Sequence, residues 1–245
     1  MSSGGLMLKQ ICDIHAHIVP GVDDGAINIE MSVAMLRKAY EQGVRNVICT
    51  SHDYGEMNRY YTRFNLLKEQ LKKEKIEINL YSGCEIYCYY DIMDEIISDL
   101  DNEIIPTINE TNYVLIEFDT HITVKEVAYC VNQLHAHGYN VIIAHVERYK
   151  NLFGQDEFLS LLKDAGCLFQ INAYSLQDET NTLVKEFARN LLQKKYVTFI
   201  GSDAHRTNHR NYMVKNGINH ILQNCDEKYA NDICYNNAKY ILNLY

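Results

Sequence analysis

The sequence has little that would divide it, export it or anchor it in a membrane. It contains only 2 prolines in 245 residues, and no repeat, low-complexity segment or Ser/Gly-rich tract interrupts it. No apolar run reaches the roughly 18 residues of a membrane span, and no basic-then-apolar leader is present. We therefore expect a cytoplasmic protein with no membrane insertion. A single domain is predicted over residues 11–245, with residues 1–10 a frayed terminus or an artificial extension.

Two further features are missing, namely a basic charge balance and paired cysteine motifs. Acidic residues outnumber basic ones by 32 to 23, and the resulting net charge of -9 disfavours nucleic-acid binding, which requires a basic face. The 8 cysteines include no C-x-x-C pair and fall mostly in apolar segments. This pattern indicates buried, reduced thiols rather than a disulfide framework or a zinc ribbon.

What the sequence does contain is a regular alternation of strand and helix patterns. Short β-branched runs are separated by segments with apolar residues three and four apart, such as Met31, Met35 and Ala39 before Gly43. Seven such units in a row predict a parallel α/β sheet, either open and doubly wound or closed into a barrel. The predicted strands are 12–19, 44–51, 78–86, 113–118, 140–146, 168–173 and 197–203.

The tripeptide HAH occurs twice, and the two copies are expected to differ in role. His15 and His17 lie near the end of the first predicted strand, where residues i and i+2 point to the same side. His135 and His137 lie in the last turn of a predicted helix before Gly138, where the two side chains diverge. We therefore expect the first pair to share a site and the second pair to act as cations near a helix C-terminus.

Six of the seven predicted strands finish in a histidine or a carboxylate. Functional groups gather at the carboxyl ends of strands in parallel α/β folds, because the loops vary there while the sheet holds them still. Imidazole and carboxylate together favour zinc, manganese or iron over calcium, which prefers oxygen ligands alone. Nine candidates result, enough for two or three divalent ions: His15, His17, Asp24, His52, Glu85, Glu117, His145, Asp203 and His205.

Two of these carboxylates are difficult to explain without a partner. Glu85 and Glu117 lie inside the apolar runs SGCEIY and YVLIEF, where a buried charge is costly unless it is paired or bound to metal. The other candidates have plainer alternatives. A single buried histidine is commonly a hydrogen-bonded core residue, and Asp23 or Asp24 before Gly25 would serve as an ordinary turn residue.

Six collinear motifs resemble those of one known group of enzymes. The segments DIHAHIVPGVDDGA, TSHDYGEMNR, SGCEIY, YVLIEF, VIIAHVERY and IGSDAH are similar to the successive motifs of the PHP (polymerase and histidinol phosphatase) superfamily. More narrowly, they resemble the metal-dependent protein-tyrosine phosphatases of Gram-positive capsule and exopolysaccharide loci. The similarity extends from about Cys12 to Arg210 with matching gaps. It implies a distorted seven-stranded (β/α)7 barrel of the PHP type.

The resemblance also implies how the ligands divide among three ions. The first ion would be held by His15, His17, Glu85 and Asp203, the second by Glu85, Glu117 and His145, and the third by Asp24, His52 and His205. Manganese is the expected metal, with iron, zinc and magnesium left open because they tolerate overlapping ligand sets.

Two arginines match the phosphate-contacting positions of these relatives. They are Arg148 in HVERY and Arg210, seven residues after Asp203. Relatives commonly carry Arg-Pro where this chain has HRNY, so the neighbouring Arg206 is an alternative to Arg210. Arg148 would hold the two nonbridging oxygens of a phosphoryl group in a planar fork.

The expected reaction is the hydrolysis of phosphotyrosine by a metal-bound hydroxide. No cysteine is followed six positions later by arginine and no D-x-D-x-T occurs, so the motifs of thiol and aspartyl-phosphate phosphatases are missing. The resemblance implies that the substrate is the phosphotyrosine-rich tail of a membrane-associated capsule kinase.

Three alternatives stay open from the sequence. The first is a small-molecule phosphatase such as histidinol phosphatase. The second is an amidohydrolase or a metal-dependent deoxyribonuclease, disfavoured because Glu117 and QINAYS stand where amidohydrolases place a lysine and a histidine. The third is a non-catalytic, metal-stabilised binding module, disfavoured because no candidate ligand is missing.

Overall fold

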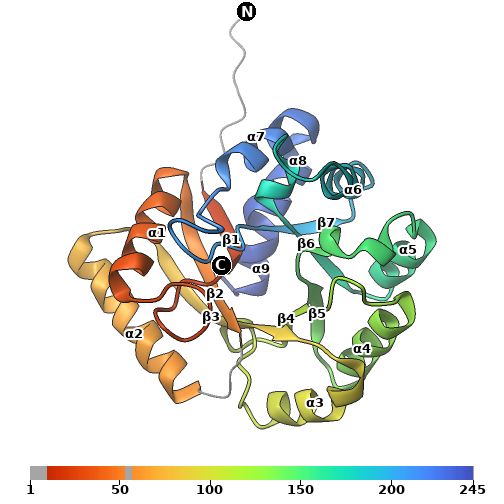
Figure 1. Cartoon of the computed structure of the whole chain (residues 1–245), viewed down its shortest axis with the longest axis horizontal. Helices are drawn as coiled ribbons and strands as arrows, with labels where there is room; N and C mark the ends of the chain where they lie inside the picture. Colours follow the sequence, from red (N-terminus) through yellow and green to blue (C-terminus); the bar gives the residue numbers. More distant parts are fainter. Residues whose placement is uncertain (1–9, 53–56, 245) are drawn as a thin grey trace, which may run out of the picture.

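The computed structural model describes residues 10–52 and 57–244, and their strands form one parallel sheet that curves into a nearly closed barrel (Figure 1). Most of the predicted terminal segment, residues 1–9, lies outside the described residues. The strands follow one another around the sheet in chain order, as β-α units joined by right-handed crossovers do in a barrel. They are β1 (Ile11–Ala16), β2 (Val44–His52), β3 (Asn79–Tyr87), β4 (Tyr113–Glu117), β5 (Asn140–Ile143), β6 (Leu168–Asn172) and β7 (Val197–Gly201).

Each strand lies within its predicted run or within a few residues of it, which confirms the seven-stranded α/β barrel. The largest differences are at the ends, because several runs bend into turns before their last apolar residue. The predicted fifth strand, for example, gives way after Ile143 to the short 3₁₀ turn Val146–Arg148. Such turns bring the strand-end residues above the mouth of the barrel.

Helices form the outer ring in Figure 1. Helix α4, for example, begins with a capping box between Thr123 and Glu126. One stripe of α4 is buried, and it includes Val127, Val131 and Leu134. The helices of the described residues are α1 (Ile29–Glu41), α2 (Met57–Glu74), α3 (Met93–Asp101), α4 (Val124–Ala136), α5 (Asp156–Asp164), α6 (Thr182–Gln193), α7 (Lys215–Asn224), α8 (Glu227–Asn231) and α9 (Asn237–Ile241).

The second HAH copy lies where the sequence predicts it. Helix α4 ends at Ala136, His137 is its C-cap, and Gly138 adopts a left-handed φ of 87°. His137 is exposed and its Nδ1 bonds the carbonyl of Gln133 within the same helix. This pair is therefore part of a helix terminus and not of the strand-end cluster.

The interior of the barrel has its own small apolar core. Strand residues such as Ile14, Leu115 and Phe199 pack there with Ile241 and Leu242 from the C-terminal end of the chain. In Figure 1, α9 accordingly lies near the centre of the view rather than in the outer ring. Because apolar side chains fill the interior, the barrel is a packed support and its polar chemistry is confined to a mouth.

The seam between β1 and β7 is closed by side chains as well as by backbone. The amide of Asp203 donates to the carbonyl of His15 at 2.8 Å, and that of His17 donates to Ala204 at 2.9 Å. At the buried end of the seam, the Asp13 carboxylate accepts hydrogen bonds from the backbone of Ser202 and from the hydroxyl of Tyr212. Residues from both ends of the chain are thereby held together.

Helix α7 packs so closely on the turn after β6 that only glycine fits at Gly217. A Cβ there would lie 2.1 Å from the carbonyl oxygen of Ala173 and 2.7 Å from its carbonyl carbon. We expect Gly217→Ala to lower the free energy of unfolding by about 1–3 kcal/mol, measured by denaturant unfolding. The exposed neighbour offers a control, Asn216→Ala, which is expected to change it by less than about 0.5 kcal/mol. Equal stability of the two variants would contradict this packing.

The structure also bears on the membrane and cysteine predictions. Among residues 10–52 and 57–244, no helix is both long and apolar enough to cross a bilayer. All 8 cysteines are free thiols, and 7 of them are buried, as predicted for reduced residues in apolar segments. Burial raises the pKa of Cys234 to about 12, so little of the nucleophilic thiolate exists at neutral pH.

Candidate metal centre

All nine predicted ligands lie at the carboxyl ends of the strands and converge on one mouth of the barrel. Strands β1, β2, β3 and β4 and the segments that follow β1, β5 and β7 supply them, whereas β6 supplies none. The side chains form three overlapping groups in which the donor atoms lie within 4.8 Å of one another. His145 joins them through Glu85 and Glu117. The convergence of His15 and His17, predicted from their spacing, is confirmed.

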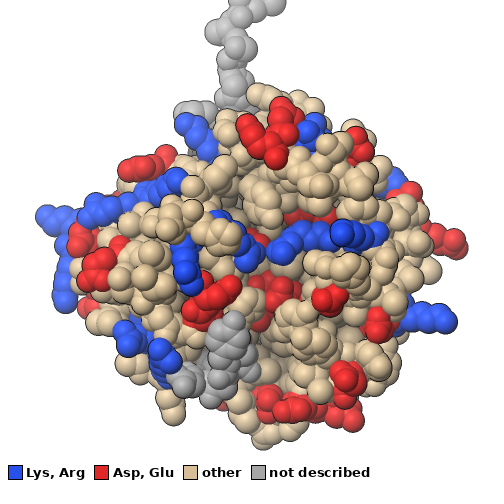
Figure 2. Space-filling model, in the orientation of Figure 1, with Lys and Arg blue, Asp and Glu red and all other residues tan. Residues whose placement is uncertain are grey.

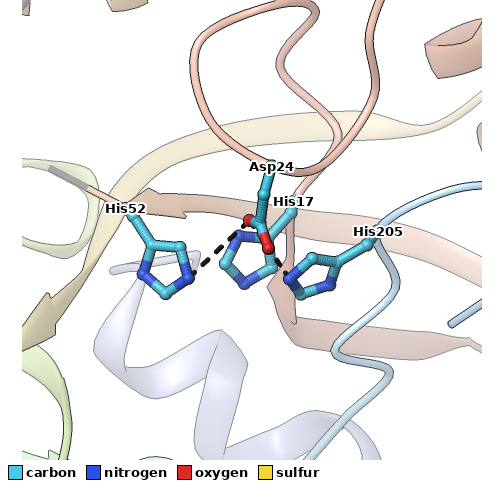
Figure 3. A group of neighbouring side chains, drawn as sticks. All are labelled: His17, Asp24, His52 and His205. Atoms are coloured by element: carbon cyan, nitrogen blue, oxygen red, sulfur yellow. Dashed lines mark ion pairs between the residues drawn. The ribbon is translucent and has the colours of Figure 1, made fainter. Parts of the chain in front are cut away.

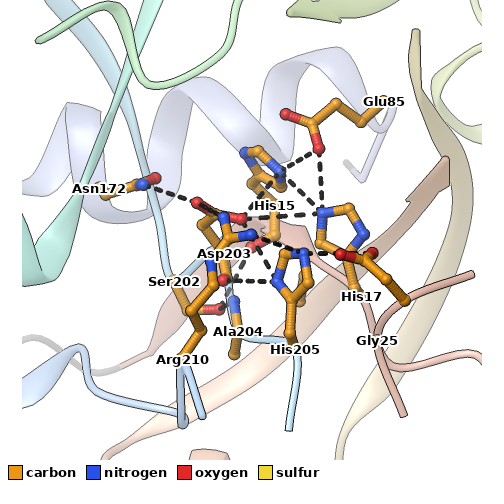
Figure 4. A network of polar contacts seen from close by, with 12 residues as sticks. His15, His17, Gly25, Glu85, Asn172, Ser202, Asp203, Ala204, His205 and Arg210 are labelled. Atoms are coloured by element: carbon orange, nitrogen blue, oxygen red, sulfur yellow. Dashed lines mark hydrogen bonds and ion pairs between the residues drawn. The ribbon is translucent and has the colours of Figure 1, made fainter. Parts of the chain in front are cut away.

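The most buried group consists of His15, His17, Glu85 and Asp203 (Figure 4). The Nε2 atoms of the two histidines are 3.2 Å apart, and each lies 3.0 Å from Oε2 of Glu85. Asp203 Oδ1 lies 3.6 Å from His15 Nε2, is fully buried, and has no hydrogen-bond partner within the described chain. The resemblance implies this same set of four for the first ion.

A second group lies nearer the surface and consists of His17, Asp24, His52 and His205 (Figure 3). Asp24 Oδ1 is 3.5 Å from His205 Nε2 and 3.9 Å from His52 Nε2, and the rings of His17 and His205 stack with centroids 3.9 Å apart. The Asp24 side chain is 53 % exposed, so this group faces the solvent. His17 stands beside the three residues that the resemblance implies for the third ion.

The third group is built around the two carboxylates from apolar strands. His145 Nε2 lies 2.9 Å from Glu85 Oε1 and 3.4 Å from Glu117 Oε2, and His52 Nδ1 lies 3.3 Å from Glu117 Oε1. Glu85 therefore takes part in two groups, with Oε2 nearest His15 and His17 and Oε1 nearest His145. A carboxylate in this position can bridge two cations. The ligand roles of all nine residues stay predictions.

Sequence reasoning missed the residues that orient these ligands. Asp23, interpreted as a turn residue, has a fully buried carboxylate that accepts from Nδ1 of His17 at 2.8 Å and from the backbone of His52 at 3.1 Å. Gln170 and Asn172 of β6 are also fully buried and bond to the cluster. The available signal was a polar side chain in an apolar strand, namely the glutamine and asparagine of LFQINA.

The hydrogen bonds of His17 and His205 identify which ring nitrogen is free. Asp23 accepts at Nδ1 of His17, and the backbone carbonyl of Asp203 accepts at Nδ1 of His205, 3.0 Å away. When neutral, both rings therefore carry their proton on Nδ1 and direct the Nε2 lone pair into the cluster. Arg210 Nη1, which can only donate, lies 2.9 Å from Nε2 of His205 and agrees with this tautomer.

The two predicted arginines meet on one atom. Arg148 Nη1 donates to Oδ2 of Asp203 at 3.3 Å, and Arg210 Nη2 bonds the same oxygen. Arg206 lies elsewhere, because its Nε donates to the backbone carbonyls of Asp24 and Gly25 at 3.0 and 3.2 Å. Arg210 thus shares a partner with Arg148, whereas Arg206 bonds other residues, and the phosphate contact stays a prediction.

A cavity of about 640 Å³ opens beside these arginines. Its lining includes Arg148, Arg210 and Asp203, and Tyr174 and Met213 contribute apolar surface. Figure 2 shows basic and acidic side chains gathered together around a hollow at the centre of one face, although the chain as a whole is acidic. The cavity lining includes Arg148, Lys150 and Arg210, which offer positive charge to an anionic substrate beside the acidic groups.

The electrostatics of the cluster reflect shared protons between its histidines and carboxylates. Burial disfavours the charged form of His145, but hydrogen bonds to Glu117 and Glu85 outweigh it and raise the pKa of His145 to about 9. Burial, with the charge of His17 adding to it, lowers the pKa of His205 to about 3. Burial also opposes ionisation of Asp203, yet the charges of His15, His145 and Arg210 hold its pKa below the usual value. Metal ions and protons compete for such atoms, so metal binding releases protons.

The donor set fits divalent metal ions. Two histidine nitrogens and a Glu85 oxygen approach one another to 3.0–3.2 Å, and together with the bonding of His17 through Nδ1 this directs several lone pairs at one point. Such an arrangement is favourable only when a cation, either a proton or a metal, lies between the donors. The mixture of imidazole and carboxylate suits manganese, iron and zinc.

The fold and this cluster define an α/β barrel with a candidate polynuclear metal site at its mouth. A family model described as "Capsular polysaccharide synthesis, CpsB/CapC" matches residues 11–243. The chain belongs to this CpsB/CapC family.

Named relatives agree with this assignment. The tyrosine-protein phosphatase CpsB of Streptococcus agalactiae serotype III is 30% identical over 240 residues, which are 94% of this chain and 97% of the relative. The tyrosine-protein phosphatase YwqE of Bacillus subtilis is 31% identical, over 84% of this chain and 82% of the relative. A crystal structure from a study of YwqE and Streptococcus pneumoniae CpsB, described as unique metal-dependent tyrosine phosphatases, matches with a TM-score of 0.85 and 28% identity, over 95% and 94% of the two chains.

Proposed function

We propose that this protein is a metal-dependent protein-tyrosine phosphatase. The observation that carries the proposal is the junction at Asp203, where a buried group of four metal-type donors meets two arginines beside a cavity. The relatives named as tyrosine phosphatases resemble the chain over nearly its full length, so they support the same activity here. A phosphotyrosine protein is accordingly the substrate class.

Nine residues would hold the metal ions in this proposal. We assign two or three divalent ions, manganese first among the candidates, to His15, His17, Asp24, His52, Glu85, Glu117, His145, Asp203 and His205. When bound, such ions lower the pKa of a coordinated water to near neutrality and stabilise the oxygens of an in-line phosphoryl displacement.

The arginines would position the phosphoryl group. Arg148 and Arg210 already direct their guanidinium groups at one oxygen of Asp203, which marks where a second anion with similar oxygens can bind. Their charge would stabilise the transition state as negative charge moves onto the transferred group. The cavity lined by Tyr174 and Met213 has room for the tyrosine ring beyond the phosphate.

The physiological substrate would be the phosphotyrosine-rich tail of a membrane-associated tyrosine kinase. The family model is described by capsular polysaccharide synthesis, and a partner of this kind would place the enzyme in the cytoplasm. The net charge of -9 makes a nucleic-acid substrate unfavourable.

Metal removal and substrate competition together test the proposed activity. We expect release of inorganic phosphate from a phosphotyrosine peptide to be lost after dialysis against a chelator and to return with Mn²⁺, because the nucleophile depends on bound metal. A phosphoserine peptide and histidinol phosphate, assayed under the same conditions, are the comparison substrates. Equal or faster turnover of histidinol phosphate would instead indicate a small-molecule phosphatase. Undiminished release in the chelator would contradict the metal mechanism, and no release with any metal would leave a binding module.

A further inference from the structure

Strand β6 contributes no candidate metal ligand, yet two of its polar side chains lie inside the cluster. Gln170 and Asn172 are both fully buried, and they occupy the space between His15 on β1 and Asp203 after β7. A buried amide is costly unless its groups are paired. The bonds that these two amides make therefore indicate what they do for the site.

The orientation of the Gln170 amide follows from a single backbone contact. The N–H of His145 can only donate, and it lies 2.8 Å from Oε1 of Gln170. This atom is therefore the carbonyl oxygen. Nε2 of Gln170 accordingly donates to Oδ1 of Asn172, at 2.9 Å.

The same oxygen determines the tautomer of His15. Oε1 of Gln170 lies 3.0 Å from Nδ1 of His15, and because an amide oxygen only accepts, Nδ1 must carry the proton. In the neutral ring the lone pair of His15 is then on Nε2, which faces Glu85 at 3.0 Å and Asp203 at 3.6 Å. Gln170 thus accepts a hydrogen bond from Nδ1 of His15, as Asp23 accepts one from Nδ1 of His17, but Gln170 is a neutral group.

Gln170 also supports a strained residue on the neighbouring segment. His145 has a φ of 31°, a left-handed value that is unfavourable for a residue with a side chain. Its backbone N–H is held by Gln170, while its Nε2 reaches Glu85 at 2.9 Å. One amide oxygen therefore orients candidate ligands from two different groups.

Asn172 extends the same connection to Asp203. Its Nδ2 donates to Oδ2 of Asp203 at 2.9 Å, and its backbone N–H donates to the buried carboxylate of Glu147 at 3.0 Å. The continuous path from His15 through Gln170 and Asn172 to Asp203 links two members of the most buried group.

We propose that Gln170 is a positioning residue that holds His15 in its Nδ1–H tautomer and so presents Nε2 to a divalent cation. This inference rests on the proposed role of His15 as a metal ligand. Partners of this kind are known to contribute to metal affinity through the orientation of the ligand. Gln170 itself donates no atom to the metal.

The first test measures the tautomer directly in the wild-type protein. Histidine ¹⁵N NMR spectra of the zinc-loaded protein are expected to show the His15 proton on Nδ1, with the signal assigned by its absence from His15→Asn. A proton on Nε2 would overturn the proposal. This measurement does not depend on any Gln170 variant being folded.

The second test compares affinity for Mn²⁺ by calorimetry, with no substrate present. Gln170→Leu removes the acceptor and is expected to weaken binding by about 10–100-fold. Gln170→Glu keeps an acceptor for both His15 and His145, so it is expected to retain the Nδ1–H tautomer and bind Mn²⁺ more tightly than Gln170→Leu. Thermal unfolding of each variant confirms that it is folded.

A matched control removes a different buried amide. Asn46 is 2 % exposed and bonds Asn79 and Tyr81, away from the cluster, so Asn46→Leu is expected to lower stability but leave Mn²⁺ affinity unchanged. Equal weakening by Asn46→Leu and Gln170→Leu would refute a positioning role, as would wild-type affinity in Gln170→Leu. A wild-type protein that binds no Mn²⁺ would instead refute the proposed metal-dependent function.

Discussion

Replacing Glu85 by alanine is expected to lower phosphate release from a phosphotyrosine peptide by about 10³-fold or more. That loss exceeds the roughly 10–100-fold typical of removing a partner behind a metal ligand. The reason is that Glu85 serves two groups: Oε2 is 3.0 Å from both His15 and His17, and Oε1 is 2.9 Å from His145. Without it, three buried imidazoles lose their shared acceptor, and in the proposed metal site two ions would lose a common ligand.

Metal content measured on the same samples identifies the cause of this loss. We expect Glu85→Ala to retain fewer equivalents of metal than wild type, and Glu85→Gln, which keeps the shape but not the charge, to be intermediate. Glu157 is exposed on α5, so Glu157→Ala controls for loss of a carboxylate without loss of a ligand. Full metal content together with more than a tenth of wild-type activity in Glu85→Ala would contradict the bridging role.

Removing Arg210 is expected to lower kcat/KM for a phosphotyrosine peptide by about 10²–10³-fold, and removing Arg148 by a similar factor. Charged donors directed at a developing oxyanion contribute on this scale. Both guanidinium groups lie against Oδ2 of Asp203 in the lining of the cavity, where a phosphoryl group would meet them. Arg210→Lys is expected to recover only part of the loss, because an ammonium cannot form the planar fork.

Two other arginines sharpen this test. Arg206 bonds the carbonyls of Asp24 and Gly25, so Arg206→Ala is expected to reduce kcat/KM less than Arg210→Ala does. Arg37 pairs with Glu74 on the outer helices, and Arg37→Ala is expected to have no effect. Metal content should stay at the wild-type level in all four alanine variants, since arginine donates no lone pair. A larger loss in Arg206→Ala than in Arg210→Ala would reverse the assignment.

Much of the fold was predictable because its signals are local. A β-branched run such as VTFIGSD favours an extended strand wherever it stands, and Gly43 and Gly138 end their helices through their own left-handed φ. The two HAH copies were separable for the same reason, since the side-chain period of a strand or a helix depends only on neighbouring residues.

The groups that surround the ligands were not predictable in this way. Asp23 and Asp24 are adjacent and chemically identical, yet one is buried behind His17 and the other is 53 % exposed beside His52 and His205. Similarly, Arg206 and Arg210 belong to the same loop, but Arg206 bonds backbone carbonyls and Arg210 bonds the Asp203 carboxylate. Nothing in their sequence neighbourhood distinguishes the members of either pair.

The sequence alone determined that seven strands follow one another and that six of them carry imidazole or carboxylate at their ends, because strand formation and side-chain period are set within a few residues. Only the tertiary structure decided which of these groups share a point, and that Gln170 and Asp23 orient them. Those relations depend on how β1 meets β7 and on where each strand stops around the barrel. They join residues as far apart as His15 and Asp203, whose approach is a property of the closed sheet.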